Sequence, residues 1–221
     1  MNFLFFMVFL AMILDWIADY KGWKKIEYFA KPSVMLFLFA WLFFSTNSLS
    51  GFTIWFGVGL LLSLAGDVFL MLSERWFIAG LVAFLLAHVA YIIGLNPTLP
   101  PFNIMGLFMA ALIGILAARL YQNIAAGLLA KGKDRLQKPV LVYTATISIM
   151  LLSALLTFSR PDWDSRVATI VSIGTALFML SDAILAWNKF VQPIKYGRVM
   201  NLGAYHLGQT ILIYGVVMQF G

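Results

Sequence analysis

Two long runs of this sequence contain no charged residue, and they limit the fold more than any other feature. They cover residues 32–66 and 76–118, which are 35 and 43 residues long. One helical crossing of a bilayer needs about 20 apolar residues. Each run is therefore long enough for more than one crossing, and the chain is expected to cross a membrane several times.

The composition agrees with a membrane protein. Of the 221 residues, 62% are hydrophobic and only 11% are charged, and the mean hydropathy is +0.94. No stretch is left for a water-soluble domain, so a soluble enzyme and a single-span anchor are both excluded. Residues 1–14 lack a basic segment and a small-residue cleavage site, so we interpret them as part of a retained helix. The absence of cysteine excludes disulfides and thiol catalysis.

We predict an all-α integral membrane protein, because backbone groups in hydrocarbon must satisfy their hydrogen bonds within the structure. The whole chain, residues 1–221, is expected to form one domain of eight transmembrane helices. The loops are short except for the fifth, which is rich in glycine and lysine. The predicted helices cover residues 2–18, 32–48, 52–72, 77–95, 103–123, 139–158, 167–187 and 199–219.

The basic residues predict the orientation of these helices. Odd-numbered loops carry 13 of the 15 Lys and Arg residues, whereas even-numbered loops carry only Arg160 and Arg166. The positive-inside rule then places the odd loops in the cytoplasm and both termini on the opposite side. The net charge of +6 reflects this topology and attraction to anionic membrane lipids. We expect membrane lipids and no nucleic acid as partners.

Polar residues inside the apolar segments recur in the same order in both halves of the chain. The first half carries Lys31-Pro32, Asp67 and His88, and the second carries Lys138-Pro139, Asp182 and His206. This order favours a parallel repeat of four plus four helices, covering about residues 1–98 and 102–221. Chance similarity between apolar segments is the alternative.

Asp67 and Asp182 are the strongest candidates for function. A carboxylate at membrane depth is unfavourable by several kcal/mol unless it is paired, neutralised or solvated. Each lies near the predicted cytoplasmic end of its helix, roughly 8 Å deep at the rise of an α-helix. One could act as an acid and the other as a base. The alternative is a structural link between helices, with Ser63 as a local donor to Asp67.

Other polar residues fall in the same half of the predicted bundle. Lys31 and Lys138 each precede a proline at a predicted helix start, where an anion such as phosphate would bind, unless they only reach the membrane surface. His88 shares a helix face with Tyr91. One stripe of the last helix, with spacings of three and four, predicts an inward-facing lining: Arg198, Asn201, Tyr205 and Gln209.

Several catalytic motifs are absent from the sequence. It contains no G-x-S-x-G turn, P-loop, H-E-x-x-H helix or glycine-rich dinucleotide turn. Two histidines and two aspartates could hold a metal, but no ligand pair has the close spacing that makes a metal site convincing. We therefore predict neither a metal nor another cofactor.

Several short motifs, spread over nearly the whole chain, match the pattern of one family of membrane proteins. They are Lys31-Pro32, Gly66-Asp67, Phe77, Gly80, Phe84, His88, Tyr91, Lys138-Pro139, Ser181-Asp182, Tyr205 and Gln209. At these positions the chain resembles the YhhN family of membrane proteins, known as lysoplasmalogenases. Each motif is weak alone, but their order and spacing make the resemblance specific. His206 departs from the family pattern, in which an aromatic residue is expected.

The resemblance implies a multipass enzyme, expected in the inner (plasma) membrane of a bacterium, that hydrolyses the vinyl ether bond of a lysoplasmalogen, a 1-alkenyl lysophospholipid. The products would be a fatty aldehyde and glycerophosphoethanolamine or glycerophosphocholine. The reaction protonates the alkenyl carbon to give an oxocarbenium ion, to which water adds. A protonated and an ionised carboxyl group supply the acid and the base, as in glycoside hydrolysis.

We assign roles on this basis and leave open which carboxyl is the acid. Asp67 and Asp182 form the catalytic pair, and His88 and Tyr205 orient water or one carboxyl group. The expected substrate-binding residues comprise phosphate ligands and lining residues: Lys31, Lys138 and Arg198, then Tyr91, Asn201, Gln209 and His206. The lipid chain is expected to enter laterally from the inner leaflet.

Two other functional classes stay open. A proton-coupled transporter of a small molecule or lipid would also need intramembrane acids and a repeat. A metal-dependent lipid amidase, in the manner of alkaline ceramidases, would need His88 and His206 as metal ligands. The presence of only two histidines argues against the amidase.

Overall fold

The computed structural model describes residues 2–46, 48–100 and 102–221, and its long elements are all helices. The long helices are α1 (Asn2–Lys21), α2 (Lys24–Ser45), α3 (Thr53–Met71), α4 (Phe77–Leu95), α5 (Ile104–Ala130), α6 (Gln137–Leu156), α7 (Ser165–Ala186) and α8 (Gly197–Phe220). Four single-turn elements join them: η1 (Glu74–Trp76), η2 (Asp134–Leu136), η3 (Thr157–Ser159) and the π-helical η4 (Trp187–Val191). The predicted all-α fold with eight helices is confirmed.

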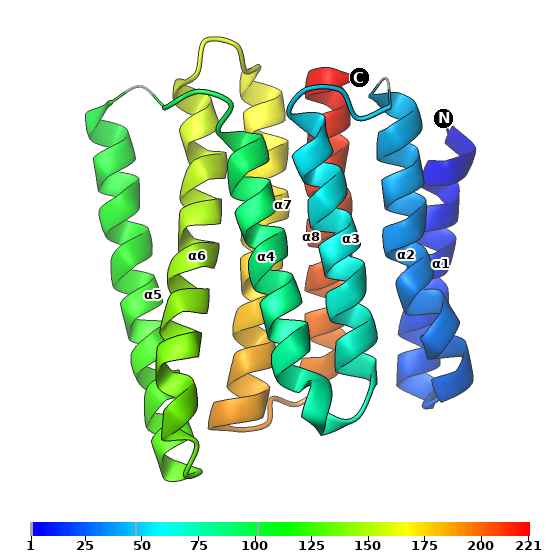
Figure 1. Ribbon diagram of the computed structural model, residues 1–221, viewed down its shortest axis with the longest axis vertical. Helices are drawn as coiled ribbons and strands as arrows, with labels where there is room; N and C mark the ends of the chain where they lie inside the picture. Colours follow the sequence, from blue (N-terminus) through cyan, green and yellow to red (C-terminus); the bar gives the residue numbers. More distant parts are fainter. Residues whose placement is uncertain (1, 47, 101) are drawn as a thin grey trace.

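Seven helical segments are long and apolar enough to cross a membrane, so the chain is an integral membrane protein: Phe3–Lys21, Lys24–Ser45, Thr53–Met71, Glu74–Leu95, Ile104–Ala130, Asp134–Ser159 and Ser165–Val191. The eighth helix, α8, is less apolar because of residues such as Asn201, His206 and Gln209. Its 24 residues nevertheless span about 36 Å. It runs alongside the other helices (Figure 1).

The helices stand side by side, with α1 at one edge of the bundle and α5 at the other (Figure 1). Helix α8 contacts α1, α2, α3 and α7, whereas α5 contacts α6 and η4. Both ends of the chain lie at the same end of the bundle, as an even number of crossings requires (Figure 1). The odd-numbered loops gather at the other end. Their cytoplasmic location stays a prediction.

The bundle has an apolar core and an apolar outer surface. The main core cluster draws buried side chains from seven helices, and a smaller one of Ile124, Leu128, Val140 and Phe190 attaches α5. Large apolar side chains also point outward, among them Phe29, Phe44 and Ile104, which are 79%, 75% and 80% exposed. Such a surface suits contact with lipid chains.

The prediction that Lys31-Pro32 opens a helix is wrong, because α2 begins at Lys24 and contains Pro32 in its interior. Proline is tolerated inside membrane helices where other groups satisfy the freed backbone. Pro32 leaves the Tyr28 carbonyl without its amide donor, and the Ser33 hydroxyl donates to the neighbouring carbonyl of Phe29, 2.7 Å away. Lys31 therefore lies two turns inside the helix, and the helix-end anion site proposed for it is not formed.

The other predicted boundaries are close, with one exception. Lys138 and Pro139 lie in the first turn of α6, as expected. Helix α5 continues to Ala130, past its predicted end at residue 123. The two halves thus differ, because Lys138 begins a helix whereas Lys31 lies inside one. The four-plus-four repeat stays a prediction.

Candidate functional site

Asp182 on α7 is held by side chains from two other helices. The Tyr143 hydroxyl of α6 donates to Asp182 Oδ2 over 2.7 Å, and His88 Nε2 of α4 lies 2.9 Å from the same oxygen. His88 is fully buried, whereas the Asp182 side chain remains 10% exposed. In the described part of the chain, Asp182 Oδ1 has no hydrogen-bond partner. One carboxyl oxygen is therefore fixed and the other is free to meet a ligand.

Asp182 lies in the wall of a groove of about 390 Å³ between α4, α5, α6 and α7. Apart from Asp182, its wall is mainly aliphatic and aromatic, with Tyr143, Thr144 and Lys138 as its other polar side chains. Lys138 is exposed and stands in the first turn of α6. We call this cavity the apolar groove. Its volume falls within the range of ordinary small-molecule sites.

Asp67 on α3 has a different set of partners. Lys31 Nζ lies 3.1 Å from Asp67 Oδ1, and the Tyr205 hydroxyl donates to Oδ2 over 2.8 Å. The Asp67 side chain is only 1% exposed. A buried carboxyl with one cation and one hydroxyl donor is well compensated. This carboxyl is therefore paired with Lys31.

Aromatic rings lie between the two carboxyl clusters. The Phe178 ring centroid is 4.7 Å from that of His88 and 5.5 Å from that of Tyr205. Phe84 also packs on Tyr205, at 5.6 Å. Among the described residues no hydrogen bond joins Asp67 to Asp182. The predicted pair is thus two separately held carboxyls, whose partners His88 and Tyr205 both pack on Phe178.

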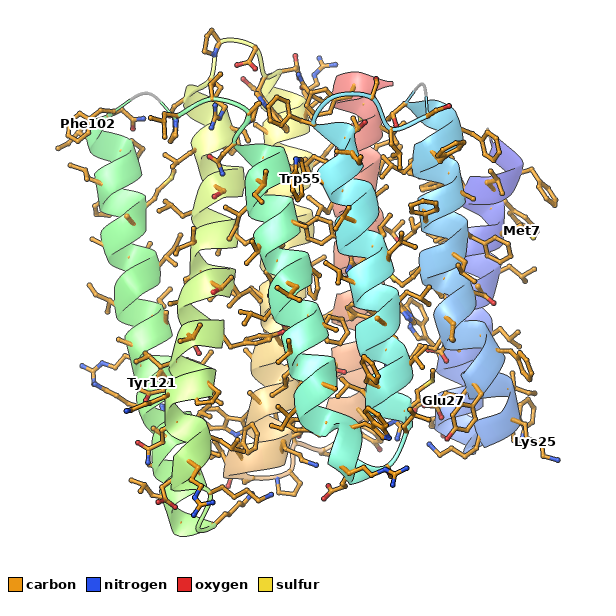
Figure 2. The ribbon with its side chains drawn as sticks, in the orientation of Figure 1. Met7, Lys25, Glu27, Trp55, Phe102 and Tyr121 are labelled. Atoms are coloured by element: carbon orange, nitrogen blue, oxygen red, sulfur yellow. The ribbon has the colours of Figure 1, made fainter. Side chains whose placement is uncertain are left out.

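The three cations predicted to bind phosphate fall into two places. Lys31 and Arg198 line a second cavity of about 410 Å³, which we call the polar pocket, while Lys138 lines the apolar groove. Arg198 makes ion pairs with Asp19 and Glu27 and is still 57% exposed. Glu27 lies on the inner side of α2 near the lower end of the bundle (Figure 2). Arg198 is therefore partly neutralised by its own neighbours.

The remaining predicted lining residues link helices. Tyr91 donates to Gln209 Oε1 over 2.7 Å, and Gln209 donates to Ser63 Oγ over 2.8 Å, which ties α4, α8 and α3 together. Asn201 donates to the carbonyl and hydroxyl oxygens of Ser181 on α7. Of these residues, Asn201 lines the polar pocket, and Tyr91 and Gln209 are fully buried.

His206 belongs to a separate buried cluster. The Trp16 indole donates to His206 Nδ1 over 3.1 Å, so the imidazole proton lies on Nε2. His206 Nε2 lies 3.8 Å from Asp15 Oδ2, and both side chains are completely buried. Among the described residues, His206 lines neither the apolar groove nor the polar pocket, and its predicted role in lining a substrate site stays a prediction. His88 and His206 lie in different clusters, which does not favour the metal-dependent amidase.

The sequence did not indicate Tyr143 or Asp15 as partners in these clusters. Tyr143 follows Pro139 by one helical turn, but tyrosine is common near membrane surfaces and carries no signal by itself. Asp15 is an acid within the apolar α1, the same signal that identified Asp67 and Asp182. It lies six residues before Lys21, the last residue of α1.

Comparison with known proteins gives a consistent result. The lysoplasmalogenase TMEM86B of Mus musculus is 28% identical over 212 residues, covering 94% of this chain and 82% of that protein. The lysoplasmalogenase TMEM86A of Homo sapiens is 31% identical over 165 residues, covering 72% and 64%. A lysoplasmalogenase of Mycobacterium bovis is 34% identical over 146 residues, covering 62% and 50%.

No solved structure matches the chain. The model of the YhhN family matches residues 26–216, which include both carboxyl clusters, the apolar groove and all of the polar pocket except Lys24. This match covers most of the sequence, with all or nearly all of each of the seven helices from α2 to α8. The chain is a member of the YhhN family.

Proposed function

We propose that this protein is a membrane-embedded lysoplasmalogenase that hydrolyses the vinyl ether bond of a 1-alkenyl lysophospholipid. The names of its relatives support this activity. The observation that carries the proposal is the position of Asp182, a carboxyl group with one free oxygen in the wall of an otherwise apolar groove. A lipid chain in that groove would bring an ether bond beside an acid.

Asp182 is the proposed general acid. Its proton sits on Oδ1, facing the groove, while Oδ2 accepts from Tyr143 and contacts His88. This proton is transferred to the alkenyl carbon that does not carry the ether oxygen. The products of this step are an oxocarbenium ion and an Asp182 carboxylate. The two contacts to Oδ2 then stabilise the new negative charge, which is the condition for efficient general acid catalysis.

The second half of the reaction adds water. The Asp182 carboxylate accepts a proton from the water that attacks the oxocarbenium carbon, and a hemiacetal forms. Its collapse breaks the carbon–oxygen bond and releases a fatty aldehyde and the glycerophospho alcohol, with no net change in protons. Asp67, the second carboxyl of the proposed pair, is held by Lys31 and Tyr205, and its partner Tyr205 packs on the same Phe178 ring as His88, so it supports the cationic intermediate from a second position.

We also propose that the protein resides in the inner (plasma) membrane of a bacterium with its odd-numbered loops in the cytoplasm. The sequence allots 13 of the 15 basic residues to the odd-numbered loops and the helix segments beside them, which supports this orientation. Both cavities lie toward the end of the bundle that carries these loops. The substrate would therefore come from the inner leaflet.

The test is aldehyde release by the purified protein in detergent, with the 1-alkenyl lysophospholipid as substrate and the 1-alkyl ether and 1-acyl ester as controls. We expect aldehyde from the alkenyl lipid alone. Asp182→Asn should lower turnover by about 10²–10⁴-fold, while Asp162→Asn, an exposed loop carboxyl, should leave it unchanged. Wild-type turnover in both Asp182→Asn and Asp67→Asn would refute the proposal, and ester cleavage would show a different bond specificity.

A further inference from the structure

The apolar groove and the polar pocket share one lining residue, Leu185 of α7. Leu185 follows Asp182 by three positions, so the two side chains lie on neighbouring parts of one helix face. It is only partly buried. The two cavities are therefore neighbours that meet at Leu185, one helical turn from the proposed acid.

The polar pocket differs from the groove in its charges. It lies among α2, α3, α7 and α8, and its charged lining residues are Lys24, Glu27, Lys31 and Arg198. Lys24 and Arg198 are 61% and 57% exposed, so water reaches this pocket. Tyr28 and Asn201 add further polar groups. A pocket with both signs of charge complements a zwitterionic group, whereas the groove complements a hydrocarbon chain.

We propose that the two cavities form one two-part site for a single-chain zwitterionic phospholipid. The alkyl or alkenyl chain lies in the apolar groove, the phosphate-bearing head group lies in the polar pocket, and the glycerol passes Leu185. This inference rests on the proposed function for the identity of the ligand. Leu185 is a positioning residue, because its side chain sets where the lipid crosses from one cavity to the other.

This arrangement explains the position of the acid. In a 1-alkenyl lysophospholipid the ether oxygen joins the chain to the glycerol, so the bond to be broken lies at the boundary between apolar and polar parts. Asp182 stands one turn from Leu185, at the same boundary of the site.

The test uses the absence of cysteine from the natural chain, which allows single reporter thiols. Leu72→Cys places a thiol in the polar pocket and Ile78→Cys places one in the apolar groove. Both positions are 45% exposed. Leu129→Cys, at a 59% exposed position that lines neither cavity, is the control. The rate of modification by a small thiol reagent is measured with and without ligand.

Three non-hydrolysable ligands separate the parts of the site. At ten times its Kd, a 1-alkyl lysophosphoethanolamine should slow modification of both the Leu72→Cys and Ile78→Cys variants about tenfold. Glycerophosphoethanolamine should protect only Leu72→Cys, and 1-alkylglycerol only Ile78→Cys. The Leu129→Cys rate should not change. Protection of Ile78→Cys alone by the lysolipid would overturn the inference. The head group would then lie outside the polar pocket, for example beside Lys138 of the apolar groove.

Leu185 is tested in the same reporter chains. Leu185→Trp fills the junction, so the lysolipid should no longer protect both thiols, while the two partial ligands should still bind. Leu185→Ala keeps the junction open and should retain double protection. Equal double protection in all three proteins would overturn the role of Leu185. Binding is measured with ligands that cannot be hydrolysed, and activity is measured separately with the 1-alkenyl lipid. Double protection in a protein that releases no aldehyde from the 1-alkenyl lipid would refute the proposed activity and retain the two-part site. Aldehyde release without double protection would retain the activity and refute the two-part site.

Discussion

Gly174 and Gly208 face each other across the contact between α7 and α8. A methyl group built on Gly174 would lie 2.9 Å from the carbonyl oxygen of Gly208, and one on Gly208 would lie 2.9 Å from the carbonyl oxygen of Gly174. The two backbones therefore approach as closely as only glycine permits, which is a common device in membrane helix packing. Asp182 follows Gly174 on α7 by about two turns, and Tyr205 precedes Gly208 on α8 by about one turn.

Gly174→Ala should destabilise the protein. The added methyl group would lie 2.4 Å from the backbone nitrogen of Leu212, so α7 or α8 must shift. We expect a loss of about 1–3 kcal/mol in the free energy of unfolding and reduced turnover. The control is Gly203→Ala on α8, where nothing lies within 4 Å. Thermal unfolding in detergent should show a lower Tm for Gly174→Ala and an unchanged Tm for Gly203→Ala.

Tyr143→Phe tests the hydrogen bond to Asp182. Without the hydroxyl, Oδ2 keeps only its contact with His88, so the carboxylate formed in catalysis is less stabilised. We expect turnover to fall about 10–100-fold, with a changed pH profile and an unchanged Tm. Tyr121→Phe, whose hydroxyl makes a long 3.4 Å contact with the Gln137 carbonyl, is the matched control. Equal activity of the two variants would remove Tyr143 from the mechanism.

Lys31→Met tests the buried ion pair with Asp67. The substitution leaves a carboxylate that is 1% exposed without its cation, and we expect about 3–5 kcal/mol of destabilisation. Asp67→Asn in the same chain should recover part of this loss, because the unpaired charge is then gone. Lys24→Met, which breaks an ion pair whose lysine is 61% exposed, should lower stability by less than about 1 kcal/mol. Similar Tm values for the two lysine variants would contradict the assignment.

The fold and the two acids could be predicted from the sequence because they follow from strong, general rules. Apolar runs of known length must be helices, and Asp67 and Asp182 stand out in them because an isolated charge is unfavourable in hydrocarbon. The start of α2 was misplaced because Pro32 is a good first residue of a helix and also a tolerated interior residue in a membrane.

The sequence named His88 and Tyr205 as residues that orient water or one carboxyl group, but which acid each of them contacts could not be predicted, because that depends on how the helices pack. Asp67 is held by Tyr205 of the last helix, and Asp182 by His88 of the fourth, so each acid is bound across the two halves of the chain. Helical spacing identifies which face a residue occupies but not which helix that face meets. For the same reason the sequence grouped Lys31, Lys138 and Arg198, which the structure divides between two cavities.

The cluster around His206 gives a last prediction, because relatives are expected to carry an aromatic residue there. Trp16, which is partly buried, donates to Nδ1 of the fully buried His206. His206→Phe leaves the Trp16 N–H without its acceptor, and Trp16→Phe leaves His206 Nδ1 without its donor. The double variant removes both groups together. A double-mutant cycle on the free energy of unfolding should therefore give a coupling of about 0.5–2 kcal/mol.

Trp163 supplies the control for this cycle. Its indole nitrogen is also buried but has no hydrogen-bond partner among the described residues, and its ring packs on Phe220. The cycle between Trp163→Phe and His206→Phe should give a coupling near zero, since distant sites add independently. Equal couplings in the two cycles would mean that His206 does not accept from Trp16. Asp15 would then be the remaining partner of His206, and Asp15→Asn should show the coupling instead.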